Sequence, residues 1–221
     1  MANKIVVNYG TSSKYKHEEV DIISKNVAIE NDERSLPIEE LFSFRFHALV
    51  IIEVLEIEIS KMVWHKAIAA YKTLQVPCIV EHAGLILTDY EERQYPGGLT
   101  QPMWDALGPE GFLKETQGGG RKAIARAAIG YCDGKDVLFF VGDTPGTLAN
   151  KPSGSRQFYW DTVFIPDEVD GAPGKLTYAE ICDDPKLGIT HKILQYSQSR
   201  RAMEKFLQHR LIKGAPELFE D

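Results

Sequence analysis

Long apolar runs are missing from this sequence. No hydrophobic stretch is long enough to span a bilayer, and no segment has the pattern of a signal peptide. Cysteine is also scarce: Cys78, Cys132 and Cys182 are scattered, odd in number and without zinc-ligand spacing. These absences predict a cytoplasmic protein with reduced thiols, no membrane contact and no structural zinc site.

Positive charge is in short supply. With 25 Lys and Arg against 32 Asp and Glu, the formal net charge is −7. Nucleic-acid binding requires a basic surface, so this balance argues against a nucleic-acid partner. The acidic net charge is compatible with binding a small phosphate compound, because carboxylates can hold Mg²⁺ while a few lysines face the phosphates. The hydrophobic content of 43% is enough for one large domain, or two closely joined lobes, over residues 1–221.

The stretch from 76 to 100 places polar residues directly after an apolar run. Cys78 to Val80 predict a short buried strand that ends at Glu81 and His82. Polar residues at a strand end lie at the carboxyl edge of an α/β sheet, where ligands bind. Tyr95-Pro96-Gly97-Gly98 predicts a turn whose backbone amides face an anion. A plain strand end and a surface turn explain the same residues.

The amino-terminal part of the chain holds a second candidate ligand site. Lys4 to Asn8 predict a strand, and Lys16 to Lys25 predict a helix after a Gly- and Ser-containing loop. The dipole and amides of a helix N-terminus favour an anion, and Lys14 adds a positive charge. The loop lacks the GxxxxGK[ST] pattern of a Walker A motif. An ordinary strand–helix turn with a capping serine is the competing interpretation.

Two further segments carry residues with possible chemistry. Phe44 to Ile59 predicts a strand with three glutamates, among them Glu53, which suits either a metal ligand or a solvated strand face. Phe158 to Pro166 predicts a strand that begins with three adjacent aromatic residues followed by Asp161. Such a strand forms either a flat slot for a nucleobase, with one acceptor, or part of the core.

The remaining segments follow helical and hairpin patterns. Ile59 to Leu74 and Ser199 to Ile212 have apolar residues at helical spacing. Lys122 to Tyr131 and Lys135 to Val141 are joined through a short link with an Asp-Gly pair, which predicts a β-hairpin. Gly142 to Ser155 contains several Pro, Gly and Ser residues and predicts a loop.

The order of these pieces resembles the inosine triphosphate pyrophosphatase family, also called the HAM1-like family. Each motif is weak alone, and the likeness comes from their joint order: Gly10-Thr11-Ser12-Ser13-Lys14, Glu81-His82-Ala83-Gly84-Leu85, Pro96-Gly97-Gly98-Leu99-Thr100, Phe158-Tyr159-Trp160-Asp161-Thr162 and Ser197-Gln198-Ser199. The resemblance implies an elongated α/β fold with a long twisted mixed sheet, flanking helices and two lobes around a central cleft. It also implies a homodimer that hydrolyses ITP, dITP or XTP to the monophosphate and pyrophosphate with Mg²⁺.

The resemblance also assigns roles to particular residues. It gives the metal to Glu81 and to Glu53 or Glu56, and the catalytic step to Glu81 and His82. A purine nucleoside triphosphate would contact Thr11, Ser12, Ser13, Lys14, Gly97, Thr100, Phe158, Trp160, Asp161, Lys192, Gln198 and Ser199.

Departures from the family pattern bear on activity. Thr11 replaces an Asn, and His82 replaces an acid; imidazole is a poor Mg²⁺ ligand, although neutral His can act as a general base. Gln198 and Ser199 replace a His-Arg pair, so a charge-assisted donor to the purine 6-oxo edge is lost.

Our main hypothesis from the sequence is a weakly active or inactive sensor of ITP- or dITP-like nucleotides. It would act with an effector protein, such as a SIR2-like NAD-depleting enzyme in antiphage defence. The alternative is an active Mg²⁺-dependent pyrophosphatase, and a purely structural role is the third hypothesis.

Overall fold

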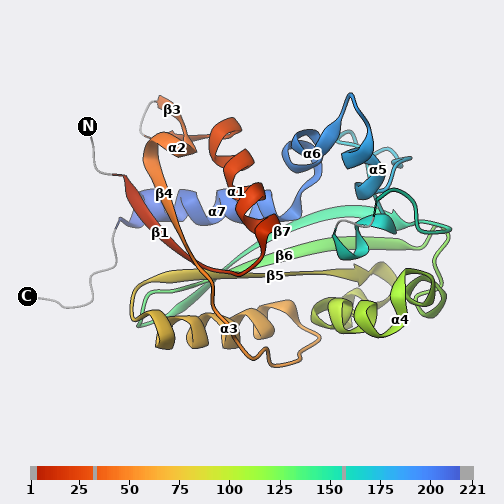
Figure 1. The fold of residues 1–221 in the computed structure, drawn as a ribbon, viewed down its shortest axis with the longest axis horizontal. Helices are drawn as coiled ribbons and strands as arrows, with labels where there is room; N and C mark the ends of the chain where they lie inside the picture. Colours follow the sequence, from red (N-terminus) through yellow and green to blue (C-terminus); the bar gives the residue numbers. More distant parts are fainter. Residues whose placement is uncertain (1–3, 32–33, 156–157, 215–221) are drawn as a thin grey trace, which may run out of the picture.

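The computed structural model describes residues 4–31, 34–155 and 158–214. A curled six-stranded mixed sheet runs along the molecule in the order β4-β1-β5-β6-β7-β8, with helices on both faces (Figure 1). Its strands are β1 (Ile5–Gly10), β4 (Phe42–His47), β5 (Cys78–Leu87), β6 (Lys122–Cys132), β7 (Val137–Leu148) and β8 (Phe164–Pro166). The short strands β2 (Ala28–Asn31) and β3 (Arg34–Pro37) form a separate hairpin.

Helices and short helical turns connect these strands. They are α1 (Lys14–Asn26), α2 (Ile38–Leu41), α3 (Ile59–Leu74), η1 (Thr88–Arg93), η2 (Gly97–Leu99), α4 (Thr100–Glu115), η3 (Tyr159–Thr162), α5 (Tyr178–Asp183), α6 (Gly188–His191), η4 (Lys192–Tyr196) and α7 (Gln198–Lys213). Helix α3 packs on β5 and β6 from one face, and α7 packs on β6 and β7 from the other. Within the described ranges, no helix is long and apolar enough to cross a membrane.

Small residues in β6 let the helices approach the sheet closely. Consecutive residues of this strand pack in hydrophobic cores on opposite faces of the sheet: Ile129 packs in the core beneath α7, and Ala128 packs in the core beneath α3. A Cβ on Gly130 would lie 2.4 Å from a methyl group of Val63 in α3, so only glycine fits there. The central strands therefore have apolar neighbours on both faces, and polar chemistry is confined to places where the sheet opens.

The sheet opens between β1 and β5. These strands run parallel and pair only at Asn8 with Cys78 and at Tyr9 with Ile79. Strand β1 then ends at Gly10, where the chain turns into α1, whereas β5 continues to Leu87 along β6. Beyond Ile79, β5 therefore has one edge without a partner strand, and the candidate site lies at this edge.

The locally patterned predictions are confirmed. The first strand and helix form β1 and α1, the segment from Ile59 to Leu74 is helical, and the predicted hairpin is β6 and β7. The last helix is also present, with Ala202, Met203, Phe206 and Leu207 buried.

Four sequence predictions about strands are wrong. The strand that begins at Cys78 does not end at Glu81 and His82, because pairing with β6 carries it to Leu87. The predicted loop after Val141 continues β7 as far as Leu148. The chain from Phe44 to Ile59 leaves the sheet after His47, so Glu53 lies on a connecting segment. Phe158 to Pro166 is not one strand: it forms the helical turn η3 and then the short strand β8.

Candidate functional site

A cavity of about 370 Å³ lies where β1 and β5 separate. We call it the Glu81 cavity. It is lined by the loop after β1, the segment between β4 and α3, the middle of β5 and η3, with single residues from α1, α3 and α4. The residues that supply its chemistry are Thr11, Ser12, Ser13, Lys16, Glu81 and His82, with Glu53 and Lys66 at one side.

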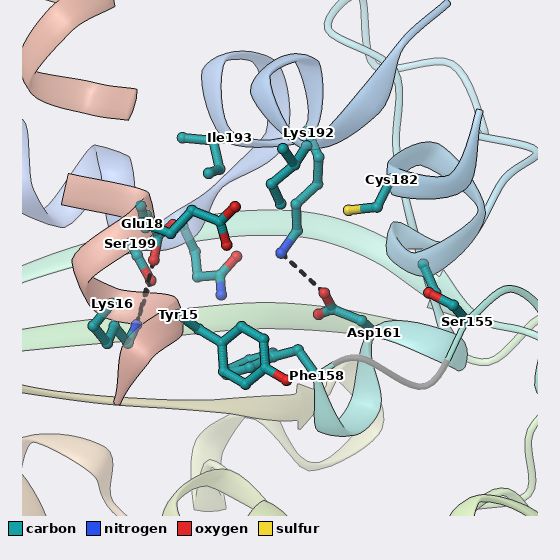
Figure 2. Close-up of a pocket in the computed structure, with 14 residues that line it drawn as sticks. Tyr15, Lys16, Glu18, Ser155, Phe158, Asp161, Cys182, Lys192, Ile193 and Ser199 are labelled. Carbon is teal, nitrogen blue, oxygen red and sulfur yellow. Dashed lines mark hydrogen bonds and ion pairs between the residues drawn. The ribbon is translucent and has the colours of Figure 1, made fainter. Parts of the chain in front are cut away.

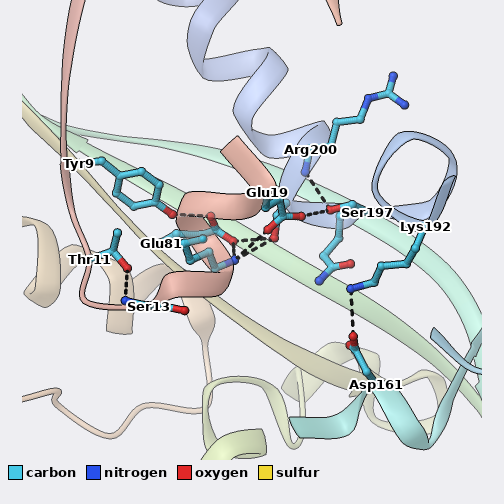
Figure 3. A network of polar contacts seen from close by, with 12 residues as sticks. Tyr9, Thr11, Ser13, Glu19, Glu81, Asp161, Lys192, Ser197 and Arg200 are labelled. Atoms are coloured by element: carbon cyan, nitrogen blue, oxygen red, sulfur yellow. Dashed lines mark hydrogen bonds and ion pairs between the residues drawn. The ribbon is translucent and has the colours of Figure 1, made fainter. Parts of the chain in front are cut away.

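Glu81 is a buried carboxylate held by three donors. Lys16 forms an ion pair with its Oε1, and the Ser199 hydroxyl donates to the same oxygen at 2.6 Å. The Tyr9 hydroxyl donates to Oε2 at 2.7 Å (Figure 3). Burial alone would raise the pKa of Glu81, but Lys16 and these hydrogen bonds hold that pKa below its usual value. The carboxylate is therefore ionised at neutral pH.

His82 lies on the other face of β5. Its Nδ1 is 3.8 Å from Oε2 of Glu53, and its Nε2 is buried without a hydrogen-bond partner among the described residues. Lys66 forms an ion pair with Glu53 and also donates to the Glu81 carbonyl at 3.3 Å. Burial, followed by the charge of Lys66, lowers the pKa of His82 to about 4. The imidazole is neutral at pH 7 and is a weak base.

The two carboxylates suit magnesium only in part. Carboxylate oxygens are the ligands that this ion prefers, but Glu81 is already paired with Lys16 and Glu53 with Lys66. In the part of the chain that the structure describes, no group of three or more His, Cys, Asp or Glu could hold a metal ion. Mg²⁺ commonly binds through one or two carboxylates together with substrate phosphates. The residues fit an ion that arrives with phosphate and do not fit an ion held by the protein alone.

A second cavity, of about 190 Å³, adjoins the first. We call it the Asp161 cavity (Figure 2). Lys192 Nζ lies 3.0 Å from Oδ2 of Asp161, whereas the buried Oδ1 has no partner among the described residues. Burial raises the pKa of Asp161, and the charge of Lys192 opposes this shift. Tyr15 and Phe158 form an aromatic wall, with their ring centroids 5.3 Å apart.

The start of α7 contributes to both cavities. Ser197 caps the helix by accepting a hydrogen bond from the Arg200 amide at 3.1 Å. Gln198 and Ser199 follow and line the Asp161 cavity. The Tyr178 hydroxyl lies 3.2 Å from Oε1 of Gln198, which leaves the amide nitrogen available on the other side. Ser199 reaches Glu81, so this motif joins the two cavities.

Lys16 and Phe158 line both cavities, which therefore adjoin each other. Most of the residues singled out in the sequence line one or both of them. The Glu81 cavity has Thr11, Ser12, Ser13, Glu53, Glu81, His82, Phe158 and Trp160, and the Asp161 cavity has Phe158, Asp161, Lys192, Gln198 and Ser199. Trp160 is mostly a core residue, because it is only 2% exposed and packs against Phe164 and Tyr178.

Four of the singled-out residues line neither of these cavities, and one of them is Glu56, the alternative to Glu53 as a metal ligand. Lys14 is exposed, with its Nζ 5.2 Å from the Tyr15 ring centroid, and it lines a separate surface hollow. Gly97 and Thr100 line neither cavity; the Thr100 hydroxyl donates to the Gly97 carbonyl at 2.6 Å and accepts from the amide of Leu85.

The prediction that the backbone amides of the turn at 95–98 face an anion is wrong for Gly98. The amide of Gly98 donates to the carbonyl of Ile57 at 2.8 Å, so it faces protein and not an anion. This hydrogen bond holds the segment that carries Glu53.

Sequence reasoning missed Lys16, Lys66 and Glu19. Lys16 lies in the first turn of a helix that the sequence did predict, so its charge near the loop was a usable signal. Glu19 follows on the same helix, lies 3.6 Å from Lys16 and accepts from the Ser197 hydroxyl at 2.5 Å (Figure 3). Lys66 lies in amphipathic α3, where a lysine is usually a surface residue, and the sequence carried no signal for its role.

Comparison with known proteins gives a consistent family. The model of the Ham1 family matches residues 7–209. A dITP/XTP pyrophosphatase of Methanopyrus kandleri is 32% identical over 149 residues, which cover 64% of this chain and 72% of that protein. Inosine triphosphate pyrophosphatase 2 of Trypanosoma cruzi is 34% identical over 131 residues, covering 58% of this chain and 62% of that protein.

Solved structures agree on the fold. The Staphylococcus aureus Ham1 protein aligns with a TM-score of 0.59 at 16% identity, covering 94% of this chain and 98% of that one. A HAM1 protein from Coxiella burnetii gives the same TM-score and identity, with 93% and 99% coverage. These matches extend the likeness over nearly the whole sheet and its helices.

Proposed function

The chain belongs to the Ham1 family, and on that premise we propose that it hydrolyses ITP-, dITP- or XTP-like nucleotides to the monophosphate and pyrophosphate with Mg²⁺. The observation that carries this proposal is that the two cavities adjoin each other and share Lys16 and Phe158. The Glu81 cavity has hydroxyl groups, a lysine and two carboxylates, and the Asp161 cavity has aromatic rings and a buried acceptor. This sequence of groups matches the triphosphate and base of a purine nucleotide.

The triphosphate binds in the Glu81 cavity. The loop from Thr11 to Ser13 leads into α1, whose first amides lack helical acceptors and favour an anion. Lys16 adds a positive charge at the point where the two cavities meet. Glu53 and Glu81 would hold Mg²⁺, which neutralises phosphate charge when it is bound together with the nucleotide.

The base binds in the Asp161 cavity beside Phe158. Oδ1 of Asp161 accepts a hydrogen bond from N1–H, which hypoxanthine and xanthine have and adenine lacks. The Gln198 amide nitrogen donates to the 6-oxo group, because Tyr178 engages the amide oxygen. Adenine would bring an acceptor to Asp161 and a donor to Gln198, so both contacts disfavour ATP.

We assign the reacting water to the His82 face of β5, opposite the face from which the Glu81 carboxylate projects. There the Nε2 of His82, which has no partner among the described residues, accepts a hydrogen bond from the water. Because the pKa of His82 is about 4, we assign this residue to orienting the water.

The sensor hypothesis is less well supported. Both curated relatives described above are named as pyrophosphatases, so a working enzyme is the better inference for this chain. A sensor would bind the same nucleotides without turnover. Homodimer formation and an effector partner stay predictions from the family resemblance.

Pyrophosphate release from ITP, dITP, XTP, GTP and ATP, with and without Mg²⁺, tests the proposal. We expect Mg²⁺-dependent release from the first three nucleotides, much slower release from ATP, and loss of activity in Glu81→Ala and His82→Ala. Calorimetric binding without release would instead establish the sensor hypothesis. Neither binding nor release would reject both.

A further inference from the structure

A third hollow, of about 630 Å³, adjoins the Glu81 cavity. The two share Ser12, Ser13, Phe158 and Tyr159, so they lie side by side at the loop after β1. We call it the Trp104 hollow. Its other lining residues are Lys14, Tyr15, Trp104, Asp105 and Pro109. The Trp104 hollow also shares Tyr15 and Phe158 with the Asp161 cavity, so all three hollows meet at Phe158. The proposed function places the base in the Asp161 cavity and the triphosphate in the Glu81 cavity, which leaves the Trp104 hollow unassigned.

Lys14 is the charged group that the proposed site leaves unused. It belongs to the same first turn of α1 as Lys16, but Lys16 lines the two inner cavities and Lys14 lines the Trp104 hollow. In the described part of the chain no ion pair of Lys14 is seen; its nearest recorded partner is the Tyr15 ring, 5.2 Å from Nζ. A lysine at this position could pair with a further phosphate that follows the γ-phosphate of a triphosphate.

The aromatic residues of the hollow are held in place. Tyr159 has a backbone φ of 23°, a strained value for a residue other than glycine, and its side chain is 39% exposed. Its hydroxyl accepts a hydrogen bond from Gln101 at 3.0 Å. Trp104 packs against buried Phe112, with the ring centroids 5.6 Å apart. Strain of this kind persists where surrounding contacts fix a residue, and it is concentrated at ligand sites.

A ligand that fills the Glu81 cavity and the Trp104 hollow has a defined chemistry. It needs a phosphate chain that passes Ser12 and Ser13, with a further phosphate near Lys14. Beyond that phosphate it needs a planar group, for which Trp104 and Tyr159 provide stacking surfaces. Asp105 adds an acceptor for a ribose hydroxyl or a base amino group. A long nucleic acid is disfavoured by the net charge of −7.

From the adjacency of these hollows and the groups that line them we infer that the protein binds dinucleoside polyphosphates, in which two nucleosides are joined 5′ to 5′ by at least four phosphates. The first purine occupies the Asp161 cavity, the phosphates cross the Glu81 cavity, and the second nucleoside occupies the Trp104 hollow. The inference rests on the proposed function for the placement of the first nucleotide.

Calorimetric titration with two matched ligands tests the inference. Di(inosine-5′) tetraphosphate and inosine 5′-tetraphosphate share one nucleoside and all four phosphates, so their difference reports on the second nucleoside. We expect the dinucleoside compound to bind about tenfold more tightly, the gain typical of one stacked base. Trp104→Leu keeps an apolar side chain against Phe112 and should remove this gain while leaving the affinity for inosine 5′-tetraphosphate unchanged.

Two exposed positions supply variants with little risk to folding. Asp105→Ala should reduce the affinity for the dinucleoside compound several-fold. Lys14→Ala should weaken both tetraphosphates more than ITP, whereas the control Lys25→Ala changes neither, because Lys25 lies at the far end of α1 and lines none of the three cavities.

Equal affinities for the two tetraphosphates would overturn the inference, as would a tenfold gain that survives both Trp104→Leu and Asp105→Ala. Absence of binding by either compound overturns it as well. The proposed function is scored separately by pyrophosphate release from ITP. If pyrophosphate release from ITP fails while the dinucleoside compound still binds, only the proposed function is rejected. If ITP is hydrolysed but the dinucleoside compound is not preferred, only the present inference is rejected.

Discussion

The ion pair between Glu81 and Lys16 stabilises the site at the scale of single residues. The Glu81 side chain is 3% exposed and that of Lys16 is 14% exposed. Each charge is removed from water, and each depends on the other for compensation. Tyr9 and Ser199 complete the coordination of the carboxylate. The pair therefore couples Glu81 on β5 to Lys16 on α1.

Glu81→Gln should lower the free energy of unfolding. The substitution keeps the shape of the side chain but leaves Lys16 buried with only Glu19, 3.6 Å away, as a counter-ion. Breaking a buried pair on one side costs about 3–5 kcal/mol, and Glu19 should keep the loss near the lower end of that range. Urea unfolding measures it. Tyr9→Phe is the control, because loss of one hydrogen bond to a charged carboxylate costs about 1.5–3 kcal/mol while the ion pair stays intact; a loss in Tyr9→Phe as large as that in Glu81→Gln would contradict the role given to the ion pair.

The pH dependence of stability should include a contribution from His82. Its pKa is lowered to about 4 in the folded protein, below the ordinary value of 6.5, so folding favours the neutral ring. The contribution is fully present above pH 6.5 and is lost as the pH falls towards 4. It amounts to roughly 3 kcal/mol at neutral pH for this buried side chain. Urea unfolding of the protein and of His82→Gln at pH 4.5 and 7 measures it: the variant should lose less stability on acidification, and an unchanged pH dependence would contradict the lowered pKa.

Among the helices and strands, local periodicity predicted the helices correctly. It did not predict how far a strand extends, because this depends on partner strands that are distant in the sequence. Helix α3 was predicted with its observed bounds, because its apolar residues repeat every turn. The extent of β5 was not predictable in this way. Glu81 and His82 look like a strand end, yet they pair with Ile129 and Ala128 of β6 and stay within the strand. Charged residues are tolerated there because the other edge of β5 faces a cavity.

The segment from 48 to 58 shows a different failure. The side chains of this segment alternate in their exposure to solvent: Val50 and Ile52 are 101% and 92% exposed, whereas Glu53 lines the Glu81 cavity. Alternation predicts a strand, but no partner strand pairs with it in the described sheet. The turn at Gly97 and Gly98 holds it in place instead.

Gly98→Ala should disturb this segment and lower activity. A Cβ at this position would lie 2.2 Å from the carbonyl oxygen of Glu56, so the segment must move and shift Glu53 with it. We expect a loss of about 1–3 kcal/mol in unfolding free energy, as for other overpacked sites, and a weaker Mg²⁺ dependence of pyrophosphate release. Gly111→Ala in α4 is the control: its Cβ would lie 3.0 Å from the Leu107 side chain and would touch no residue of the 48–58 segment, so the Mg²⁺ dependence should not change. Normal magnesium dependence in Gly98→Ala would show that Glu53 is not a metal ligand.

Across the whole molecule, the site is assembled from segments that are distant in sequence. Lys16 contacts Ser199 across 183 positions, and Ser199 contacts Glu81 across 118. Periodicity and local composition carry no information about such pairs. Most of the residues that the family resemblance singled out line the Glu81 or Asp161 cavity, because its motifs record the assembled cleft. Lys14 lines the Trp104 hollow instead, since a shift of two positions on α1 moves a lysine from one hollow to another.

The overall charge arrangement makes a last prediction about magnesium. Because Lys16 and Lys66 already neutralise Glu81 and Glu53, the ion should not bind to the nucleotide-free protein, and the net charge of −7 does not compensate for two occupied carboxylates. We expect no saturable heat when Mg²⁺ alone is titrated, and tight binding once a non-hydrolysable ITP analogue supplies phosphate oxygens. Lys66→Met frees Glu53 and should raise the affinity for Mg²⁺ alone, whereas Lys72→Met, on the exposed surface of the same helix, should not. Saturable binding of Mg²⁺ to the unmodified, nucleotide-free protein would contradict this prediction. It would show that the ion displaces the lysines from the carboxylates and binds the protein before the substrate does.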